Sequence, residues 1–368
     1  MDKGAYAVHK ALREELESYI NAQYFDKAEV LRKSVESQMR EEGVLYREPF
    51  IEASPLYKSV PDGISKIDLP NWMRDFLNDL SNKNLGVYKS PYTHQLKALE
   101  AFNKGKDIFV STGTGSGKTE CFIWPIICKL AQEAKLNKTW SLRGARVMIM
   151  YPMNALVSDQ LSRLRRIMGD PQGEFLEAFQ HAVGNQRRPQ FGMYTGRTAY
   201  PGLSPVKSND DKLRRSLSHF TAHSEEDEEY YRDLLKQGRV PAKYNLDRFI
   251  EALKNSEHIT DPLDAEMITR FEMQRICPDI LITNYSMLEY MLMRPQEQQI
   301  WNNTRTWLHD SKENKLLFVI DEAHMYRGSS GGEVALLMQR QMENLRLEMF
   351  FFQMLIFNAR LAVLLYMN

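Results

Sequence analysis

The stretch FVSTGTGSGKTECF, residues 109–122, indicates the fold class of this chain of 368 residues. An apolar segment leads directly into a run with three glycines, five hydroxyl side chains and one lysine. A strand, a glycine-rich turn and a helix in this order form the phosphate-binding pattern G-x-x-x-x-G-K-[S/T]. Thr112 takes the place of the first glycine, while Gly117, Lys118 and Thr119 follow in register. The alternative is a glycine-rich turn without a ligand.

The residue types of this loop suit a nucleoside triphosphate with its metal ion. Glycines allow backbone N–H groups to turn toward phosphate oxygens, and the following helix presents its positive end to them. Lys118 would reach the β- and γ-phosphates, and Thr119 would hold Mg²⁺. The residues expected to bind the nucleotide in the loop are Thr114, Gly115, Ser116, Gly117, Lys118 and Thr119.

Six short apolar segments alternate with helical stretches after about residue 90. They are residues 107–112, 146–151, 191–196, 279–284, 316–321 and 352–357. Apolar runs separated by helices predict a mostly parallel α/β sheet flanked by helices. Ligands bind such sheets beyond the carboxyl ends of the strands, so the residues directly after each segment are the candidates.

The fifth segment ends in the residues Asp321-Glu322-Ala323-His324. Asp321 would hold Mg²⁺ through water, because this cation keeps several waters when it binds to protein. Glu322 would orient or deprotonate the attacking water. We therefore expect Lys118, Asp321 and Glu322 as catalytic residues, with Thr119 and Asp321 on the metal. Lys118 and Asp321 should then lie side by side at the tips of adjacent strands.

The combination of TGTGSGKT with DEAH resembles the superfamily 2 helicases of the DEAD/DEAH-box class, which have RecA-like domains. The resemblance covers about residues 88–357 and implies ATP and Mg²⁺ as cofactors, with hydrolysis coupled to single-stranded nucleic acid. It further implies that Gln95, in YTHQ, reads the adenine and that His324 couples the two sites. The sequence DEAHMYRGSSGGEVALLMQR is similar to bacterial repair-type and phage-defence helicases, which favours DNA over RNA.

Three further segments resemble the family's motifs that contact the nucleic-acid backbone: YPMNALVSDQ (151–160), YTGRT (194–198) and TNYSMLEYMLMRP (283–295). The residues expected to make these contacts are Pro152, Asn154, Thr195, Gly196, Thr283 and Asn284. Short side chains at strand ends let a phosphate backbone approach closely. For Thr195 and Thr283 the alternative is an ordinary turn at a strand end. The arginines of LSRLRR either border this track or, as we favour, cover a solvated helix face.

The pattern of the chain predicts two regions. A helical accessory region is expected over residues 1–90, because apolar residues recur at helical spacing in its first part. After a boundary near Ser90–Pro91, a RecA-like ATP-binding domain is expected over 91–368, with a polar insertion at about 201–265. The acidic run of this insertion should be a solvated face, since it would repel nucleic acid.

The composition is that of an ordinary globular protein and gives no charge argument for nucleic acid. Basic and acidic residues number 48 each, so any polyanion site must be local. Three cysteines without a CxxC pair argue against a disulfide scaffold and fit a reducing cytoplasm. The last 20 residues could span a bilayer by length, but Gln353, Asn358 and Arg360 favour a strand followed by a tail. We expect no membrane segment.

The sequence departs from the family near its end. A superfamily 2 motor has two RecA-like domains, and the second supplies an arginine finger, but no second set of strands follows here. The place of the family's Ser-Ala-Thr motif is taken by Asn358-Ala359-Arg360. We expect the front half of a motor, either a fragment or a truncated product whose last ten residues follow a shifted reading frame. A second chain that supplies the missing domain is the other possibility.

These features leave several functions open. The leading hypothesis is an ATP-dependent helicase or translocase, represented by its ATP-binding half. The others are a nucleotide-dependent nucleic-acid-binding module without turnover, a truncated inactive remnant, and a P-loop kinase. ATP turnover stimulated by single-stranded DNA separates the motor from the module.

Overall fold

The structure is a computed structural model. Its contacts divide the chain into two compact units, with the boundary in the sequence between Leu56 and Tyr57. It describes residues 4–25, 28–48, 56–113, 115–136, 138–169, 173–184, 186–199, 202, 204–221, 227–326, 328–345 and 352–358. The tail over residues 359–368, which the sequence suggested follows a shifted reading frame, lies outside the described residues.

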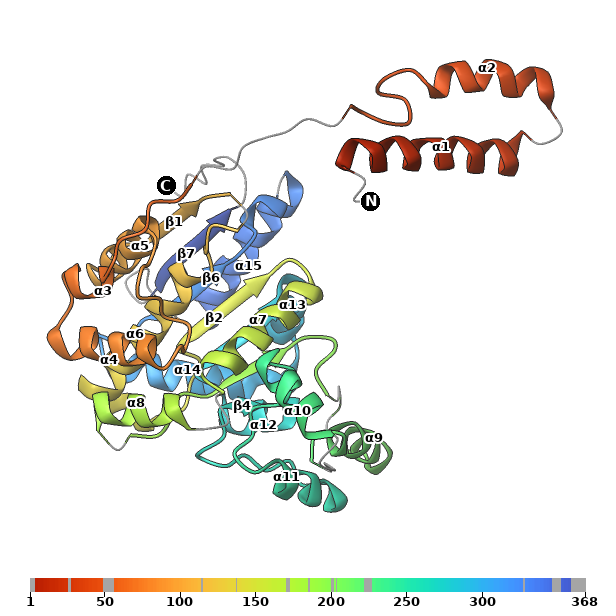
Figure 1. Cartoon of the computed structure of the whole chain (residues 1–368). Coiled ribbons are helices and arrows are strands. Elements are labelled where there is room, and N and C mark those ends of the chain that lie inside the picture. Colours follow the sequence, from red (N-terminus) through yellow and green to blue (C-terminus); the bar gives the residue numbers. More distant parts are fainter. Residues whose placement is uncertain are drawn as a thin grey trace. The chain divides into compact units, whose positions relative to one another are not determined.

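The first unit is a pair of helices, α1 (Ala5–Tyr24) and α2 (Glu29–Met39) (Figure 1). The carboxylate of Glu17 joins them, because it lies 3.3 Å from the guanidinium of Arg13 in its own helix and 3.3 Å from that of Arg40. The predicted helical character of this region is therefore confirmed. Its apolar residues nevertheless stay largely exposed, namely Leu12, Leu16 and Tyr19.

The second unit is built on a sheet of seven strands in which every paired strand runs parallel to its neighbour. The strands are β1 (Ile108–Ser111), β2 (Val147–Tyr151), β3 (Phe191–Tyr194), β4 (Glu266–Met267), β5 (Ile280–Asn284), β6 (Leu316–Ile320) and β7 (Phe352–Asn358). Six of them confirm the six predicted segments. The two-residue strand β4 was not predicted, because it is too short to give an apolar run.

The order of the strands is β1-β7-β6-β2-β5-β3-β4. Strand β7 lies between the P-loop strand and the acidic strand, because Leu355 pairs with Ile108 on one side and with Val319 on the other. The expectation that Lys118 and Asp321 follow adjacent strands is therefore wrong. Parallel strands still end at one edge, so the two residues share that edge with one strand between them.

Helices cover both faces of the sheet, as Figure 1 shows. One face packs against α4 (Asn71–Asn82), α5 (Thr93–Asn103), α6 (Glu120–Leu136), α7 (Asn154–Ile167) and α8 (Glu174–Val183). The other packs against α12 (Arg270–Ile276), α13 (Tyr285–Met293), α14 (Gln298–Asp310) and α15 (Ser329–Leu345). Alternate residues of the central strands enter the two cores, as period-two geometry requires. The protein therefore has the RecA-like three-layer fold that the sequence predicted.

The segment before the expected boundary belongs to the main core. Phe76 and Leu77 of α4 are buried, and the Phe76 ring packs edge-on against Phe175 and Phe179 of α8. The short helix α3 (Gly63–Lys66) precedes α4 and also contributes to this core. The contacts thus place the division ahead of Tyr57 instead of near residue 90. The functional assignment of residues 1–90 and 91–368 stays a prediction.

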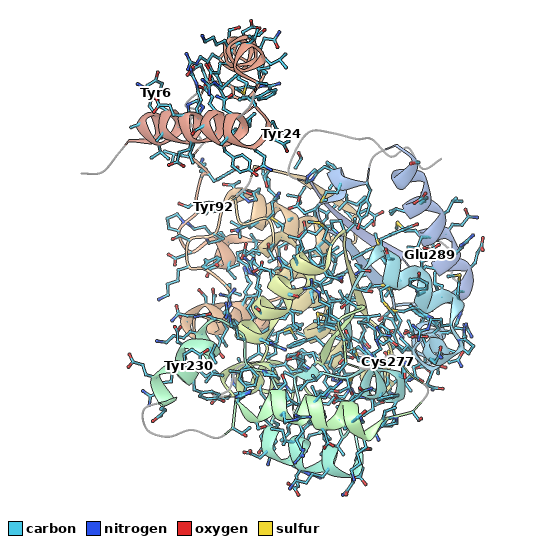
Figure 2. All side chains as sticks on the ribbon, turned by 90° about the vertical axis from the view of Figure 1, so that its right-hand side faces the viewer. Tyr6, Tyr24, Tyr92, Tyr230, Cys277 and Glu289 are labelled. Carbon is cyan, nitrogen blue, oxygen red and sulfur yellow. The ribbon has the colours of Figure 1, made fainter. Side chains whose placement is uncertain are left out.

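The polar region after Gly196 holds three further helices, α9 (Lys207–Ser218), α10 (Asp227–Lys236) and α11 (Leu246–Ala252). Three buried side chains give it a small core: Leu217, Phe249 and Leu253. Its acidic helix α10 presents the exposed side chain of Tyr230 (Figure 2). Whether this region is an insertion with a role of its own stays a prediction.

Within the described ranges, no helix combines the length and the apolar character that crossing a bilayer demands. The segment that raised this question forms strand β7 in its first half.

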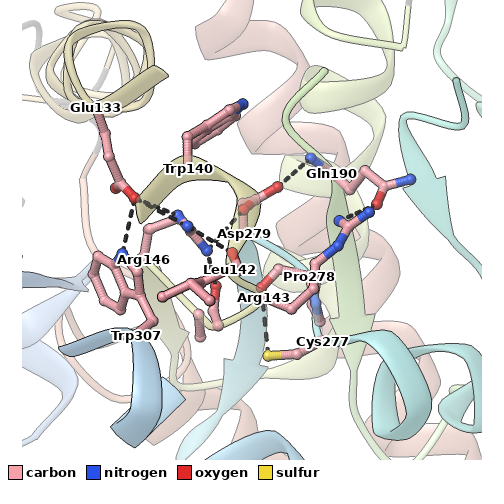
Figure 3. A network of polar contacts seen from close by, with 12 residues as sticks. Glu133, Trp140, Leu142, Arg143, Arg146, Gln190, Cys277, Pro278, Asp279 and Trp307 are labelled. Atoms are coloured by element: carbon pink, nitrogen blue, oxygen red, sulfur yellow. Dashed lines mark hydrogen bonds and ion pairs between the residues drawn. The ribbon is translucent and has the colours of Figure 1, made fainter. Parts of the chain in front are cut away.

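A buried ion cluster closes the amino edge of the sheet (Figure 3). Arg146, which directly precedes β2, is fully buried and lies 2.9 Å from Glu133 of α6 and 3.2 Å from Asp279, which directly precedes β5. Asp279 also accepts two 2.7 Å hydrogen bonds from Arg187. Burial alone would raise the pKa of Asp279, but Arg187 and Arg146 outweigh it and hold that pKa below its ordinary value.

We expect Arg146→Met to lower the free energy of unfolding by about 3–5 kcal/mol, the usual effect of removing one partner from a buried ion pair. The carboxylate of Glu133 would remain buried with only neutral donors such as Trp307 Nε1. Urea unfolding followed by circular dichroism measures the change. The matched control is Arg248→Met, because Arg248 is an ion-paired arginine whose side chain is 67% exposed. Equal effects of the two substitutions would contradict a structural role for Arg146.

Candidate nucleotide and nucleic-acid site

The loop after β1 has the backbone of a phosphate cradle. Gly115 and Gly117 have φ angles of +73° and +70°, in the left-handed region that favours glycine. A Cβ atom on Gly117 would also lie 2.5 Å from Nε2 of Gln95. The carbonyls of Lys118 and Thr119 accept hydrogen bonds from the first turn of α6, so both residues sit at its positive end. The expected binding residue Thr114 lies outside the described residues.

Two side chains from the start of α5 hold this loop in place. Gln95 is 1% exposed and donates to the carbonyl of Gly117 at 2.9 Å, while its own carbonyl accepts from the Tyr92 amide at 2.8 Å. The ring of His94 contacts the carbonyl of Ser116 at 2.9 Å, and burial lowers the pKa of His94. Both ends of the Gln95 amide are thus used. The adenine-reading role of Gln95 stays a prediction, and support of the loop is a role that the sequence did not indicate.

The acidic segment follows β6 at the same edge of the sheet. Asp321 is 8% exposed, and its amide donates to the carbonyl of Met150 on β2. Glu322 has a left-handed backbone, with φ +51°, and its amide donates to Oδ1 of Asp321 at 2.8 Å. A non-glycine residue in this conformation stores strain, of the order of 1–3 kcal/mol. The ring Nδ1 of His324 lies 3.1 Å from a carboxylate oxygen of Glu322.

Electrostatics connect the acidic segment to the loop. Burial raises the pKa of Asp321 from its ordinary 3.8 to about 6. The Glu322 amide, the Lys118 ammonium and the Arg163 guanidinium act in the opposite direction. Lys118 therefore lies within electrostatic reach of Asp321, although β7 separates their strands. That the two groups share one magnesium-bound nucleotide stays a prediction.

The six candidates for nucleic-acid contacts lie at the ends of β2, β5 and β3, which are neighbours in the sheet. Asn154 begins α7 and accepts a 2.6 Å hydrogen bond from Asn284 at the end of β5. Pro152 and Asn154 are half-buried, and Gly196 is exposed. These residues form a continuous edge beside the acidic segment.

Three of the six candidates have buried side chains, namely Thr195, Thr283 and Asn284. Thr283 is fully buried, and its hydroxyl donates to the carbonyl of Tyr194 at 2.8 Å. Thr195 is 1% exposed, and its hydroxyl accepts from the Arg197 amide. The hydroxyls of Thr283 and Thr195 both make hydrogen bonds to neighbouring backbone groups, as ordinary turns at strand ends would. Their contacts with nucleic acid stay predictions.

The arginines of α7 differ from the solvated face that the sequence favoured. Arg163 lies 3.0 Å from Glu120, the first residue of α6, and Arg165 makes two 2.7 Å hydrogen bonds to Glu266. Only Arg166 of the three is exposed. The partners lie 43 and 101 residues away along the chain, so no local pattern could have indicated the pairs.

A cavity of about 1170 Å³ lies against the C-terminal part of α7 and α10. None of the expected nucleotide-binding residues lines it. Two of the basic side chains that line it already have acidic partners in the protein, since Arg165 pairs with Glu266 and Lys243 pairs with Asp264. Size alone therefore does not make it the nucleotide site.

Residues 92–198 match the family model described as DEAD/DEAH box helicase. The chain is 39% identical over 361 residues to Druantia protein DruE of Escherichia coli (strain UMEA 4076-1), a match that covers 92% of this chain and 19% of that protein. It is 34% identical over 88 residues to the uncharacterized ATP-dependent helicase YprA of Bacillus subtilis (strain 168), covering 24% and 10% of the two chains.

Among solved structures, the DUF1998 helicase MrfA bound to DNA and AMPPNP aligns with a TM-score of 0.44 at 18% identity, over 89% of this chain and 30% of that one. In the comparison with the DruE relative, this chain spans about a fifth of that protein's length. The helicase-domain match contains the P-loop, and the DruE match extends over most of the chain. Residues 92–198 therefore carry a DEAD/DEAH box helicase domain, and most of the chain is similar to the DruE relative.

Proposed function

We propose that this chain binds Mg²⁺-ATP and hydrolyses it, and that this reaction is coupled to binding of a single-stranded DNA backbone. The chain would then act as the ATP-binding part of a helicase or translocase. The observation that carries the proposal is that the glycine-rich loop before α6 and the buried carboxyl of Asp321 lie at the same carboxyl edge of the sheet. That edge also holds Asn154 and Gly196, the proposed contacts for the nucleic-acid backbone.

The proposed roles follow from charge and position. Lys118, at the first turn of α6, would stabilise the β- and γ-phosphates, and Thr119 with Asp321 would hold Mg²⁺. Glu322 would act as the base toward the attacking water, since it directly follows the proposed metal ligand Asp321. His324 lies beside Glu322 and would connect it to the nucleic-acid edge. An arginine finger from a second RecA-like domain, in this protein or in another chain, would complete the site.

The proposed nucleic-acid contacts are made to the backbone of the strand. Backbone contacts by short side chains carry no base specificity, so the preference for DNA rests on the resemblance around residues 321–340. The three cysteines are all buried thiols, in keeping with a reducing cytoplasm as the place of action.

One feature favours a second candidate function. The family's Ser-Ala-Thr motif is replaced by Asn358-Ala359-Arg360, which lacks the hydroxyl pair that links the two sites. A module in which ATP changes the grip on nucleic acid without turnover would need no such link. Turnover measurements decide between the two functions.

We expect Lys118→Ala to weaken Mg²⁺-ATP binding by about 10- to 100-fold, because a charge-assisted hydrogen bond to phosphate is lost. Glu322→Gln should keep the affinity and lower single-stranded-DNA-stimulated turnover by about 10²–10⁴-fold, the usual contribution of a general base. Fluorescence titration and a phosphate-release assay measure the two quantities. Lys312→Ala, in an exposed loop, serves as the charge-matched control. Unchanged ATP binding by Lys118→Ala would refute the P-loop assignment, and binding without turnover in the wild type favours the module.

Asp321 gives a pH-dependent prediction for the ligand-free protein. Its folded pKa of about 6 lies above its ordinary 3.8, so the folded state holds the proton more tightly. The stability from this group is therefore present below 3.8 and is lost as the pH rises through about 6. The loss amounts to about 3 kcal/mol at 1.4 kcal/mol per pH unit.

We expect Asp321→Asn to be more stable than the wild type by up to about 3 kcal/mol at about pH 7.5, and no more stable at about pH 4. Urea unfolding at the two pH values, without Mg²⁺, measures this difference. Asp310→Asn, at an exposed position, is the control. If the effect of Asp321→Asn on stability were the same at both pH values, burial would not raise the pKa of this carboxyl.

A further inference from the structure

The first residue of α6 touches both the P-loop and a second helix. Glu120 is 7% exposed, and its Oε1 accepts a 3.0 Å hydrogen bond from Nη1 of Arg163. Its Oε2 lies against the loop, 3.1 Å from the point that a Cβ atom of Gly117 would occupy. One carboxylate thus faces the phosphate cradle with one oxygen and α7 with the other.

The guanidinium of Arg163 is placed among the groups of the nucleotide site. Its side chain is 29% exposed, which is low for an arginine in the middle of a helix on the protein surface. Its charge also acts on Asp321, whose pKa it helps to keep from rising further. Arg163 is therefore ion-paired with Glu120, which lies beside the P-loop, and its charge also acts on Asp321.

Helix α7 carries this guanidinium and the nucleic-acid edge on one rigid element. Asn154 is its first residue and is bonded to Asn284. Arg163 follows nine residues later, about 14 Å along the axis at 1.5 Å per residue. The Glu120–Arg163 ion pair and the proposed nucleic-acid contact Asn154 are therefore joined by one helix.

We infer that the Glu120–Arg163 ion pair couples the nucleotide site to the nucleic-acid edge through α7. Both are positioning residues, since neither is placed on the phosphates or on the strand. Bound phosphates would lie in the loop that the Glu120 carboxylate faces, and hence would change the position of this carboxylate and its ion pair with Arg163. Such coupling is reciprocal, so nucleic acid should tighten or loosen nucleotide binding through the same pair. The inference rests on the proposed function.

The test measures affinity for a fluorescent, non-hydrolysable ATP analogue with Mg²⁺, with and without a single-stranded oligo-dT. The ratio of the two affinities is the coupling factor. We expect Glu120→Gln and Arg163→Met to reduce this factor by about 2- to 30-fold, the range for residues on a coupling route. Nucleotide affinity without DNA should change far less. Arg166→Met removes the same charge from an exposed position of the same helix and should leave the factor unchanged.

Further variants separate coupling from structural damage. The double variant of Glu120→Gln with Arg163→Met should lose no more coupling than either single variant, because one pair is removed in each case. Arg163→Lys keeps the charge and should retain part of the factor. If Arg163→Met fails to fold, Glu120→Gln and Arg163→Lys carry the test.

The results that would overturn this inference differ from those that would overturn the proposed function. Single variants with the wild-type coupling factor overturn the inference and leave ATP binding intact. A wild-type protein that binds nucleotide with no response to DNA overturns the coupling alone. A wild-type protein that binds no nucleotide overturns the proposed function itself.

Discussion

A buried guanidinium at the amino edge of the sheet sets the geometry on which the rest depends. Arg146 binds Glu133 of α6 and Asp279 at the start of β5, and it directly precedes β2. Ions are costly to bury, so such a cluster persists only where every charge is paired and hydrogen-bonded. Because it holds a helix and two strand beginnings together, the far ends of these elements are also held in register. The nucleotide and nucleic-acid candidates lie at those far ends.

Most strands of the sheet could be predicted from the sequence, but the order in which they lie beside one another could not. Six strands could be predicted because strands buried on both faces are continuous apolar runs, and the P-loop marked the turn after the first. Strand β4 escaped because Glu266 and Met267 are too few to form a pattern. The place of β7 between β1 and β6 depends on a crossover between distant segments, which no local signal encodes.

The same division holds for the candidate site. The places of Lys118, Asp321 and Glu322 directly after strand segments could be predicted from the sequence, and their roles, which rest on phosphate and metal chemistry, stay predictions. The burial of Thr283 and the ion pair of Glu120 with Arg163 could not be predicted, because both depend on packing between elements far apart in sequence. Local patterns identify groups that meet a ligand, whereas the groups that hold them in place emerge only from tertiary contacts.

The position of β7 has a consequence for the order of assembly. Among the described strands, β1 is paired only with β7, so Ile108 finds its partner in Leu355, which comes much later in the sequence. Contacts this distant in sequence form late, because the intervening chain must first be ordered. During synthesis the strand that carries the P-loop therefore stays without this neighbour until the segment of β7 has left the ribosome. A nascent chain would complete the sheet beside its P-loop only after that point.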